Sequence, residues 1–389
     1  VEEAAMLDRR LFLGVACSAA ASPLITPVVF ADAPGDRRLV VIILRGGLDG
    51  LGMVQPYGDR AFAALRPGLA KRPGDGLTDL DGRFGLEASF DGLLPMWRSG
   101  ELGFVHAVST PYRDKRSHFD GQDLLENGNG ASDGQLTRGR DGWLNRALAQ
   151  IPGARADYAM AVGQSHMLLL HGDAPSGSWS PTNVMTLQND ERRLLSLLYA
   201  GDPLFASALQ GANMLAGDGE ASSRRETGAT LAGYAAERLN GPARIAAFSL
   251  GGWDTHRRQQ NAIRQPARQL ADALTSLKKD LGRNWDNTVV LAMTEFGRTA
   301  RENGSGGTDH GTGGVMILSG GAVRGGRIYG QWPGLGERDL YQNRDLVPTD
   351  DVRRWAAWAL SAQFGLSRRA LERDIFPGVD LGGPPGFMA

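Results

Sequence analysis

The sequence predicts an α/β fold built on a mostly parallel central sheet. Three apolar runs, at residues 39–44, 244–250 and 288–293, show no polar alternation, which is typical of strands buried on both faces. Segments with the apolar spacing of amphipathic helices lie between the predicted strands. This alternation of strands and helices indicates a parallel sheet that is covered by helices.

The same patterns place the remaining elements along the chain. Further strands are expected at 102–108, 158–162 and 315–318. Helices are expected where apolar residues recur at helical spacing, at 62–67, 90–98, 118–126, 191–199, 224–239, 266–281 and 352–364. Residues 163–219 lack strand alternation, so we expect a helical insertion there. The mature chain, 32–389, is expected to form a single domain.

Charge and cysteine content exclude several classes of function. The 389 residues carry 42 basic and 43 acidic side chains, a net charge of -1, and these are well mixed along the chain. No basic footprint for a nucleic acid is present, so no nucleic-acid partner is expected. The only cysteine, Cys17, lies near the N-terminus, which leaves the rest of the chain without disulfides or thiolate metal ligands.

The N-terminus resembles an export signal. Residues 8–13 read Asp-Arg-Arg-Leu-Phe-Leu, a twin-arginine pattern, and an apolar stretch of small residues runs on to about Ala31. We therefore expect a twin-arginine (Tat) signal peptide over 1–31, cleavage before Asp32, and a periplasmic or secreted protein that has the Tat machinery as an export partner. A retained membrane anchor is disfavoured by Pro23 and Pro27, and no stable membrane span is expected after cleavage.

Carboxylates and imidazoles follow the three buried strands. Because strand ends meet in a crevice at one edge of an open α/β sheet, these side chains are expected to converge. The predicted metal ligands are Asp49, Asp254, His256, Glu295, Asp309 and His310. Mixed nitrogen and oxygen ligation suits a divalent metal ion, with zinc preferred and calcium, magnesium or manganese as alternatives.

Other readings stay open for three of these residues. Asp254 could instead cap a helix, and Glu295 could form an ion pair with Arg298 or Arg301. Asp309 could orient the imidazole of His310 rather than bind the metal ion.

A second set of candidate catalytic residues opens the helix at 118–126. Ser117 stands where a helix N-terminus and a metal ion would both stabilise its alkoxide, and Arg113 and Arg116 could hold the oxygens of an anionic ester. His118 is either part of this site or a surface histidine. Ser117 can equally be an N-cap, because Asp120 follows three residues later.

The motifs together resemble a known bacterial family. They are the twin-arginine start, Leu-Arg-Gly-Gly-Leu-Asp-Gly at 44–50, Arg-Ser-His-Phe-Asp at 116–120, Gly-Gly-Trp-Asp-Thr-His at 251–256, Thr-Glu-Phe-Gly-Arg-Thr at 294–299 and Thr-Asp-His-Gly at 308–311. The chain resembles the secreted family called domain of unknown function 1501, which is similar to the alkaline phosphatase and sulfatase superfamily. The resemblance implies an alkaline-phosphatase-like three-layer αβα sandwich with a mostly parallel central sheet and a helical insertion.

The resemblance also implies roles by position. Asp49, Ser117, the pair Asp254 and His256, Glu295 and His310 occupy places that correspond to superfamily site residues. Phe296 stands where a metal-binding histidine is expected, which removes one ligand from a second metal position. In an alternative alignment, Asp309 and His310 take the place of Glu295 and Phe296.

These features lead to two expected functions. The first is an exported metal-dependent hydrolase that acts on a phosphate or sulfate ester of a small molecule or glycan, with Ser117 as nucleophile. The alternative is a non-catalytic periplasmic or cell-surface binding protein on a degenerate phosphatase or sulfatase scaffold, and Phe296 favours it.

Overall fold

The computed structural model describes residues 35–130, 141–163, 167–179 and 226–389. The predicted signal peptide, the predicted helix at 191–199 and most of the predicted insertion lie outside these residues. The described part of the insertion, 167–179, contains a short 3-10 helix, Leu168–Leu170, and a strand, β8 (Gly177–Trp179). A strand of three residues is too short to show alternation, which explains why the sequence pattern does not reveal it.

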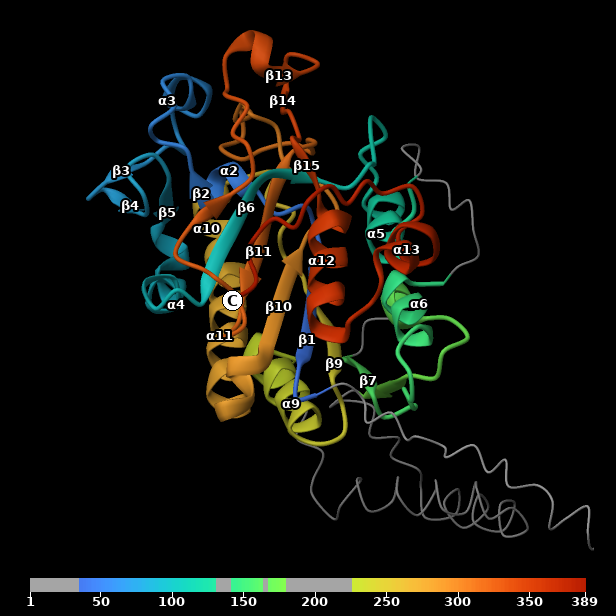
Figure 1. Cartoon of the computed structure of the whole chain (residues 1–389). Helices are drawn as coiled ribbons and strands as arrows, with labels where there is room; N and C mark the ends of the chain where they lie inside the picture. Colours follow the sequence, from blue (N-terminus) through green and yellow to red (C-terminus); the bar gives the residue numbers. More distant parts are fainter. Residues whose placement is uncertain (1–34, 131–140, 164–166, 180–225) are drawn as a thin grey trace, which may run out of the picture.

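A large central sheet forms the middle of the molecule (Figure 1), and its strands run in the order β12-β6-β11-β10-β1-β9-β7-β8. The strand bounds are β12 (Ile328–Tyr329), β6 (Leu102–Ser109), β11 (Gly314–Ser319), β10 (Thr288–Met293), β1 (Arg38–Leu44), β9 (Ile245–Leu250) and β7 (Ala159–Val162). β1 pairs in parallel with both β10 and β9, and β7 continues this parallel run, whereas β11 is antiparallel to its two neighbours. The predicted mostly parallel sheet is confirmed.

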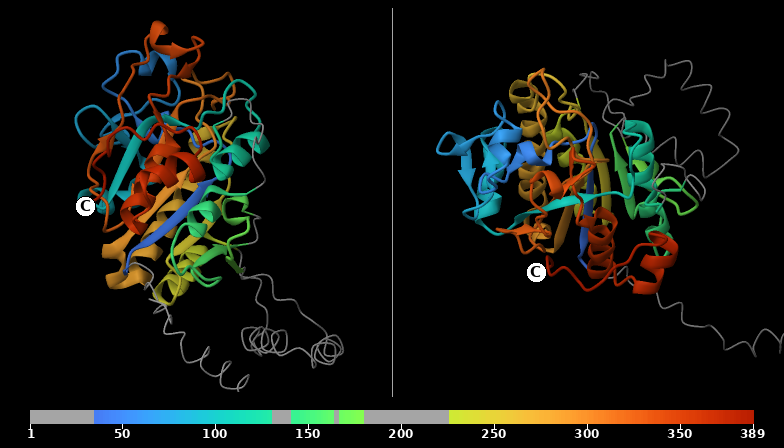
Figure 2. Two further views of the ribbon diagram at one scale, coloured as in Figure 1. Left: turned by 45° about the vertical axis from the view of Figure 1, so that its right-hand side comes forward. Right: turned by 90° about the horizontal axis from the view of Figure 1, so that it is seen from above.

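Helices cover both faces of the sheet, as Figures 1 and 2 show. Strand residues alternate between the faces, so Val41 of β1 packs with the core under one helical layer while Val40 packs with the core under the other. The first layer includes α6 (Trp143–Ala149) and α12 (Val352–Phe364), and the second includes α9 (Gly228–Asn240), α11 (Arg264–Leu281) and α4 (Leu94–Arg98). The predicted three-layer αβα sandwich is confirmed.

Several small elements lie at the edge of the sheet where β1, β9 and β10 end. The hairpin of β13 (Leu340–Tyr341) and β14 (Asp345–Leu346) lies there, at the top of Figure 1. A separate sheet runs in the order β2 (Val54–Gln55), β5 (Gly85–Glu87), β4 (Gly76–Asp79) and β3 (Arg72–Pro73). Neither element is predicted from the sequence, because strands of two to four residues carry too little periodicity. None of the helices in the described residues is both long and apolar enough to cross a membrane.

The buried His106 of β6 gives folding stability a predicted pH dependence. Its Nε2–H donates to the carbonyl oxygen of Val54 at 2.9 Å and its Nδ1 accepts from the amide of Ala107 at 3.0 Å, which satisfies the neutral ring completely. Burial lowers the pKa of His106 to about 4, and the hydrogen bond to Val54 opposes this shift only in part.

Because the pKa of His106 is depressed in the folded state, the unfolded chain takes up the proton first as the pH falls. Stability from this residue is complete above pH 6.5, the pKa of an unperturbed histidine. We expect about 3 kcal/mol to be lost between there and pH 4. Urea unfolding of wild type and His106→Gln at pH 7 and pH 4.5 measures the effect. Equal pH dependence in the two proteins would contradict this assignment.

Candidate metal centre

Parallel pairing brings three predicted site segments to one edge of the sheet. The strands β9 and β10 flank β1 on either side, so the residues that follow all three strands are neighbours. The amide of Gly46, after β1, donates to Glu295 Oε1, after β10, at 2.8 Å. The amide of Trp253, after β9, donates to the carbonyl oxygen of Arg45 at 3.4 Å. The loops that follow these strands therefore meet at one edge of the sheet, where the sequence predicts that the site residues converge.

Three imidazoles and one carboxylate converge at this edge of the sheet. His118, Asp254 and His310 offer ligand atoms that all lie within 4.8 Å of one another. Asp254 Oδ1 lies 3.5 Å from His118 Nε2, 3.2 Å from His310 Nε2 and 3.0 Å from His256 Nε2. The Nε2 atoms of His256 and His310 are themselves only 3.0 Å apart.

The Nδ1 atom of each imidazole is held by an oxygen. His118 Nδ1 lies 2.7 Å from Glu295 Oε1, His256 Nδ1 lies 3.2 Å from Asp309 Oδ1, and His310 Nδ1 lies 2.9 Å from the carbonyl oxygen of Arg116. Carbonyl and carboxylate oxygens only accept, so in the neutral tautomer that carries its proton on Nδ1 each ring would present its Nε2 lone pair to the cluster. His118 Nε2 is buried and has no hydrogen-bond partner.

This arrangement fits a metal ion. Lone pairs of three imidazoles that face a carboxylate repel one another, and a cation between them removes the repulsion. Bonds of 2.0–2.1 Å from zinc to nitrogen and oxygen give a tetrahedron with edges of about 3.3 Å. The separations of Asp254 Oδ1 from the three Nε2 atoms, and of His256 Nε2 from His310 Nε2, are 3.0 to 3.5 Å, close to that length. A set of three nitrogens and one oxygen also suits other first-row transition metals.

Arg298 fixes the carboxylate of this cluster. Its guanidinium is fully buried and donates to Asp254 Oδ1 at 2.6 Å. Burial alone would raise the pKa of Asp254, but the hydrogen bond and charge of Arg298 outweigh it and lower the pKa to about 2. Arg298 therefore pairs with Asp254 rather than with Glu295, the partner considered in the sequence. Asp254 also caps no helix, because the N-cap of α10 (Gln259–Ala262) is Arg258.

Glu295 contacts the Nδ1 side of His118 and is not one of the converging donors. Its Oε1 accepts from His118, from the amide of Gly46 and from Gln122 Nε2 at 3.1 Å. Burial would raise the pKa of Glu295, but these hydrogen bonds, with that of His118 the largest, lower it. The carboxylate is ionised and holds the His118 proton on Nδ1. The role observed for Glu295 is to orient His118, and Asp309 has the same relation to His256.

Phe296 packs against two of the imidazoles, His118 and His310, whose own ring centroids are 4.3 Å apart. Its ring centroid lies 5.0 Å from that of His118 and 5.0 Å from that of His310. The side chain is buried, and the Cα atoms of Gly47 and Gly121 approach its ring so closely that added Cβ atoms would meet it at 2.8 and 3.1 Å. Phe296 therefore forms an apolar wall that limits the rotation of both rings.

A short antiparallel ribbon positions His310. Arg298 and His310 form an isolated bridge, and the amide of Gly311 donates to the carbonyl oxygen of Gly297 at 2.8 Å. A Cβ on Gly297 would lie 1.9 Å from the carbonyl oxygen of Gly313, so only glycine fits there. The ribbon lays His310 against the end of β10, and this pairing of residues 12 positions apart has no periodic signal in the sequence.

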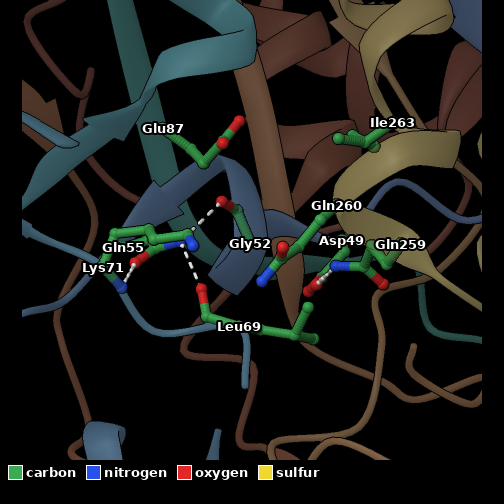
Figure 3. A pocket seen from close by; sticks show the side chains of 9 residues that line it. All are labelled: Asp49, Gly52, Gln55, Leu69, Lys71, Glu87, Gln259, Gln260 and Ile263. Atoms are coloured by element: carbon green, nitrogen blue, oxygen red, sulfur yellow. Dashed lines mark hydrogen bonds between the residues drawn. The ribbon is translucent and has the colours of Figure 1, made fainter. Parts of the chain in front are cut away.

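Asp49 stands apart from the converging imidazoles. It is buried in an ion pair with Arg66, whose NH2 lies 3.0 Å from Asp49 Oδ1, and Gln259 Nε2 donates to its Oδ2. Figure 3 shows Asp49 and Gln259 on the wall of a pocket that Gln55 and Lys71 also line. Gln259 Oε1 in turn accepts from Thr255 and Thr308, so this network braces the loops behind the cluster.

The candidate catalytic residues lie on the loop that precedes α5 (His118–Asn127). Ser117 is the N-cap of this helix, and its Oγ accepts from the amide of Asp120 at 3.4 Å. Arg113 donates to carbonyl oxygens of its own loop, at Thr110 and Tyr112.

Arg116 contributes through its main chain and its side chain. It has a left-handed φ of 53°, which turns its carbonyl oxygen toward His310. Its guanidinium lies 3.7 Å from Asp345.

Residues 204–375 match a protein family described as "Protein of unknown function (DUF1501)". This part of the chain, less than half of its length, is similar to that family. The resemblance stated from the motifs is confirmed, and the matched region contains Asp254, His256, Glu295 and His310, whereas His118 lies outside it. No curated protein has significant sequence similarity to the chain.

Solved structures with a similar arrangement include the zinc complex of the C-terminal periplasmic domain of EcEptC from Escherichia coli. It is 13% identical, the match covers 92% of this chain and 93% of that chain, and the TM-score is 0.42. Lipooligosaccharide phosphoethanolamine transferase A from Neisseria meningitidis is 11% identical, with 94% and 64% covered and a TM-score of 0.39. An alkaline phosphatase superfamily protein from Vibrio parahaemolyticus is 14% identical, with 73% and 60% covered and a TM-score of 0.34.

Proposed function

We propose that this protein is an exported, metal-dependent hydrolase of phosphate or sulfate esters. The observation that carries the proposal is the convergence of three imidazole Nε2 atoms on Asp254, each ring being held through its Nδ1 by an oxygen acceptor. A divalent metal ion bound there, zinc by preference, would stabilise negative charge on an ester oxygen and lower the pKa of a nearby hydroxyl.

The chain's own residues support this role before any substrate binds. Arg298 keeps Asp254 ionised, and Glu295 keeps the His118 proton away from the cluster. The N-terminus of α5 places partial positive charge beside Ser117. Arg116, whose guanidinium is about one third exposed, is available to pair with an anionic ester. These groups act on the ester through charge and position.

Ser117 is the proposed nucleophile. It directly precedes His118 in the chain, so its hydroxyl lies at the same helix end as a proposed metal ligand. Its hydrogen bond to the amide of Asp120, at 3.4 Å, is longer than the usual range of 2.7–3.2 Å, which indicates a weak cap that can be given up. In the proposed reaction Ser117 Oγ releases its proton to water and bonds to phosphorus or sulfur, while the bond to the ester leaving oxygen breaks and that oxygen takes up a proton. Water then attacks the same phosphorus or sulfur, which breaks the bond to Ser117 Oγ and restores its hydroxyl.

Two substitutions separate the cap from the nucleophile. We expect Ser117→Asn to keep the cap and the folding stability while ester turnover falls by roughly three orders of magnitude, because the amide oxygen caps well but does not attack. Ser117→Ala should lose turnover and also about 1 kcal/mol of stability. Steady-state kinetics and urea unfolding measure both effects. Full turnover in Ser117→Asn would assign Ser117 to capping alone.

Elemental analysis tests the metal centre. We expect the mature chain, 32–389, purified without added metal or chelator, to contain about one equivalent of a transition metal. His118→Ala and His310→Ala should contain less than roughly a tenth of that, because each removes a donor that the fold has already oriented. His171→Ala, at an exposed histidine outside the cluster, is the matched control. A metal-free wild type after reconstitution would contradict the proposal.

A binding protein is the second candidate, and Phe296 favours it. This ring packs against His118 and His310, so no second metal position is formed on that side by the described residues. Chromogenic phosphate monoesters, phosphate diesters and sulfate esters should be offered to the metal-loaded protein. Stoichiometric metal without turnover of any of them would favour the binding protein over the hydrolase.

A further inference from the structure

The candidate centre has four protein donors, which has a consequence for catalysis. Catalytic zinc sites keep one position open for water or substrate, whereas four protein ligands close a tetrahedral site. His118, Asp254, His256 and His310 would therefore leave no place for an ester oxygen. One of the four donors must therefore be displaced from the metal ion when substrate binds, or must not coordinate the ion at all. The surrounding structure holds the three histidine rings in place to different degrees. The least firmly held ring is the one expected to leave the metal ion.

His118 has the most firmly held support. Its acceptor, Glu295, has a completely buried side chain and also accepts from Gly46, Gln122 and Thr294, so the carboxylate cannot follow a moving ring without losing several hydrogen bonds. The ring of His118 is itself only about one quarter exposed. Both the imidazole and its anchor are therefore fixed.

A buried polar chain extends this support along α5. Gln122 Oε1 accepts from Arg45 NH1 at 2.7 Å, and Arg45 NH2 lies 2.6 Å from Glu126 Oε1. His118, Gln122 and Glu126 are spaced four residues apart, so they occupy one face of the helix. Glu126 also accepts from the amide of Leu169 at 3.0 Å. Moving His118 would disturb this whole row.

His310 is anchored by the main chain. Its Nδ1–H donates to the carbonyl oxygen of Arg116, and its backbone belongs to the ribbon that pairs with Gly297 and Arg298. Its side chain is less exposed than that of any other member of the cluster, at 19%. The His310 ring also contacts Phe296, which fills the space that a rotated ring would need.

His256 has the weakest support. Its side chain is 38% exposed, and the carboxylate that holds its Nδ1, that of Asp309, is 52% exposed. The contact between them is 3.2 Å, and Asp309 Oδ1 is shared with Asn303 Nδ2 at 3.0 Å. Exposed ion pairs of this kind contribute little, because water competes for both partners. Phe296 forms no ring contact with His256 among the contacts that the structure describes.

We infer that His118, Asp254 and His310 are the permanent metal ligands and that His256 is an exchangeable fourth donor. Its departure opens the position that an anionic ester oxygen takes. Distance alone does not choose among the histidines, because His256, Asp254 and His310 also lie within 3.2 Å of one another; the choice rests on how firmly each ring is held. This inference rests on the proposed metal centre, and it assigns to His256 a role distinct from that of the other histidines.

Metal affinity measured by competition with a chelator tests this ranking in the mature chain. His256→Ala should keep about one equivalent of zinc with at most roughly tenfold weaker binding, whereas His118→Ala and His310→Ala should bind at least about 100-fold more weakly. Asp309→Asn, which leaves the imidazole in place, should resemble His256→Ala. Circular dichroism checks that each variant is folded. Loss of zinc from His256→Ala as complete as from His118→Ala would overturn the inference.

Cobalt(II) substitution provides a readout that does not depend on activity. In the wild type, inorganic phosphate should change the visible absorption of the cobalt protein as it replaces His256. In His256→Ala the position is already open, so phosphate should bind at least as tightly. Weaker phosphate binding in His256→Ala would overturn the inference. If the ranking holds but no ester is hydrolysed, the proposed activity fails and the ligand assignment stands; a wild type that binds no metal overturns both.

Discussion

Replacement of Arg298 by methionine is expected to lower the free energy of unfolding by roughly 4 kcal/mol and to remove the metal ion. The guanidinium is completely buried, and besides Asp254 it donates to four carbonyl oxygens, at Gly46, Gly47, Trp253 and Thr308. Methionine fills a similar volume but donates no hydrogen bond, so these buried acceptors lose their partner. The site loops after β1 and β9 then lose the side chain that ties them together.

Urea unfolding and elemental analysis of the same preparations measure both effects. Arg301→Met is the matched control, because Arg301 lies three residues further along and is exposed, so its stability should stay within about 0.5 kcal/mol of wild type. Arg298→Lys should fall between the two, since it keeps the charge but not the planar fork of donors. Wild-type metal content in Arg298→Met would show that Asp254 holds its position without the guanidinium.

The main strands and helices could be predicted because their signals are local. The apolar runs at 39–44 and 288–293 coincide with β1 and β10 to within one residue, and the predicted helix at 352–364 coincides with α12. Continuous apolar runs mark strands that are buried on both faces, and the two core clusters show this burial. The hairpin of β13 and β14 escapes prediction, because each of its strands has only two residues.

The sequence predicts which segments meet at the site, because that follows from the order of the strands. It does not predict the role of each side chain. Parallel strands end at one edge, which suffices to bring Asp254 and Glu295 together, but not to tell a metal ligand from the carboxylate behind it. That distinction depends on which side chain faces which, as the contact of Glu295 with His118 Nδ1 shows. The pairing of Arg298 with Asp254 is equally non-local, since 44 residues separate them. For His118, the signal available in the sequence was the four-residue spacing that places it on one helix face with Gln122.

The loop after β1 is the second place where a substitution should have a large effect on stability and on the metal centre, here through one added methyl group. Gly46 has a φ of 121°, and a Cβ there would lie 2.6 Å from the backbone nitrogen of Asp254 and 3.0 Å from the carbonyl carbon of Trp253. Neither backbone atom can yield alone, because Trp253 is completely buried and its indole donates to the carbonyl oxygen of Leu250. An added methyl group therefore pushes on the residue that supplies the only carboxylate among the converging donors.

We expect Gly46→Ala to lose about 3 kcal/mol of folding stability and most of the bound metal, since backbone strain and overpacking act together at this position. Gly251→Ala is the matched control in the facing loop, where a Cβ meets nothing within 4 Å, so its stability and metal content should match wild type. Thermal unfolding with metal analysis of the same samples compares them. If Gly46→Ala is destabilised but keeps its metal, Asp254 can shift without leaving the ion. Loss of metal with little loss of stability would instead show that the spacing between these two loops controls the centre itself.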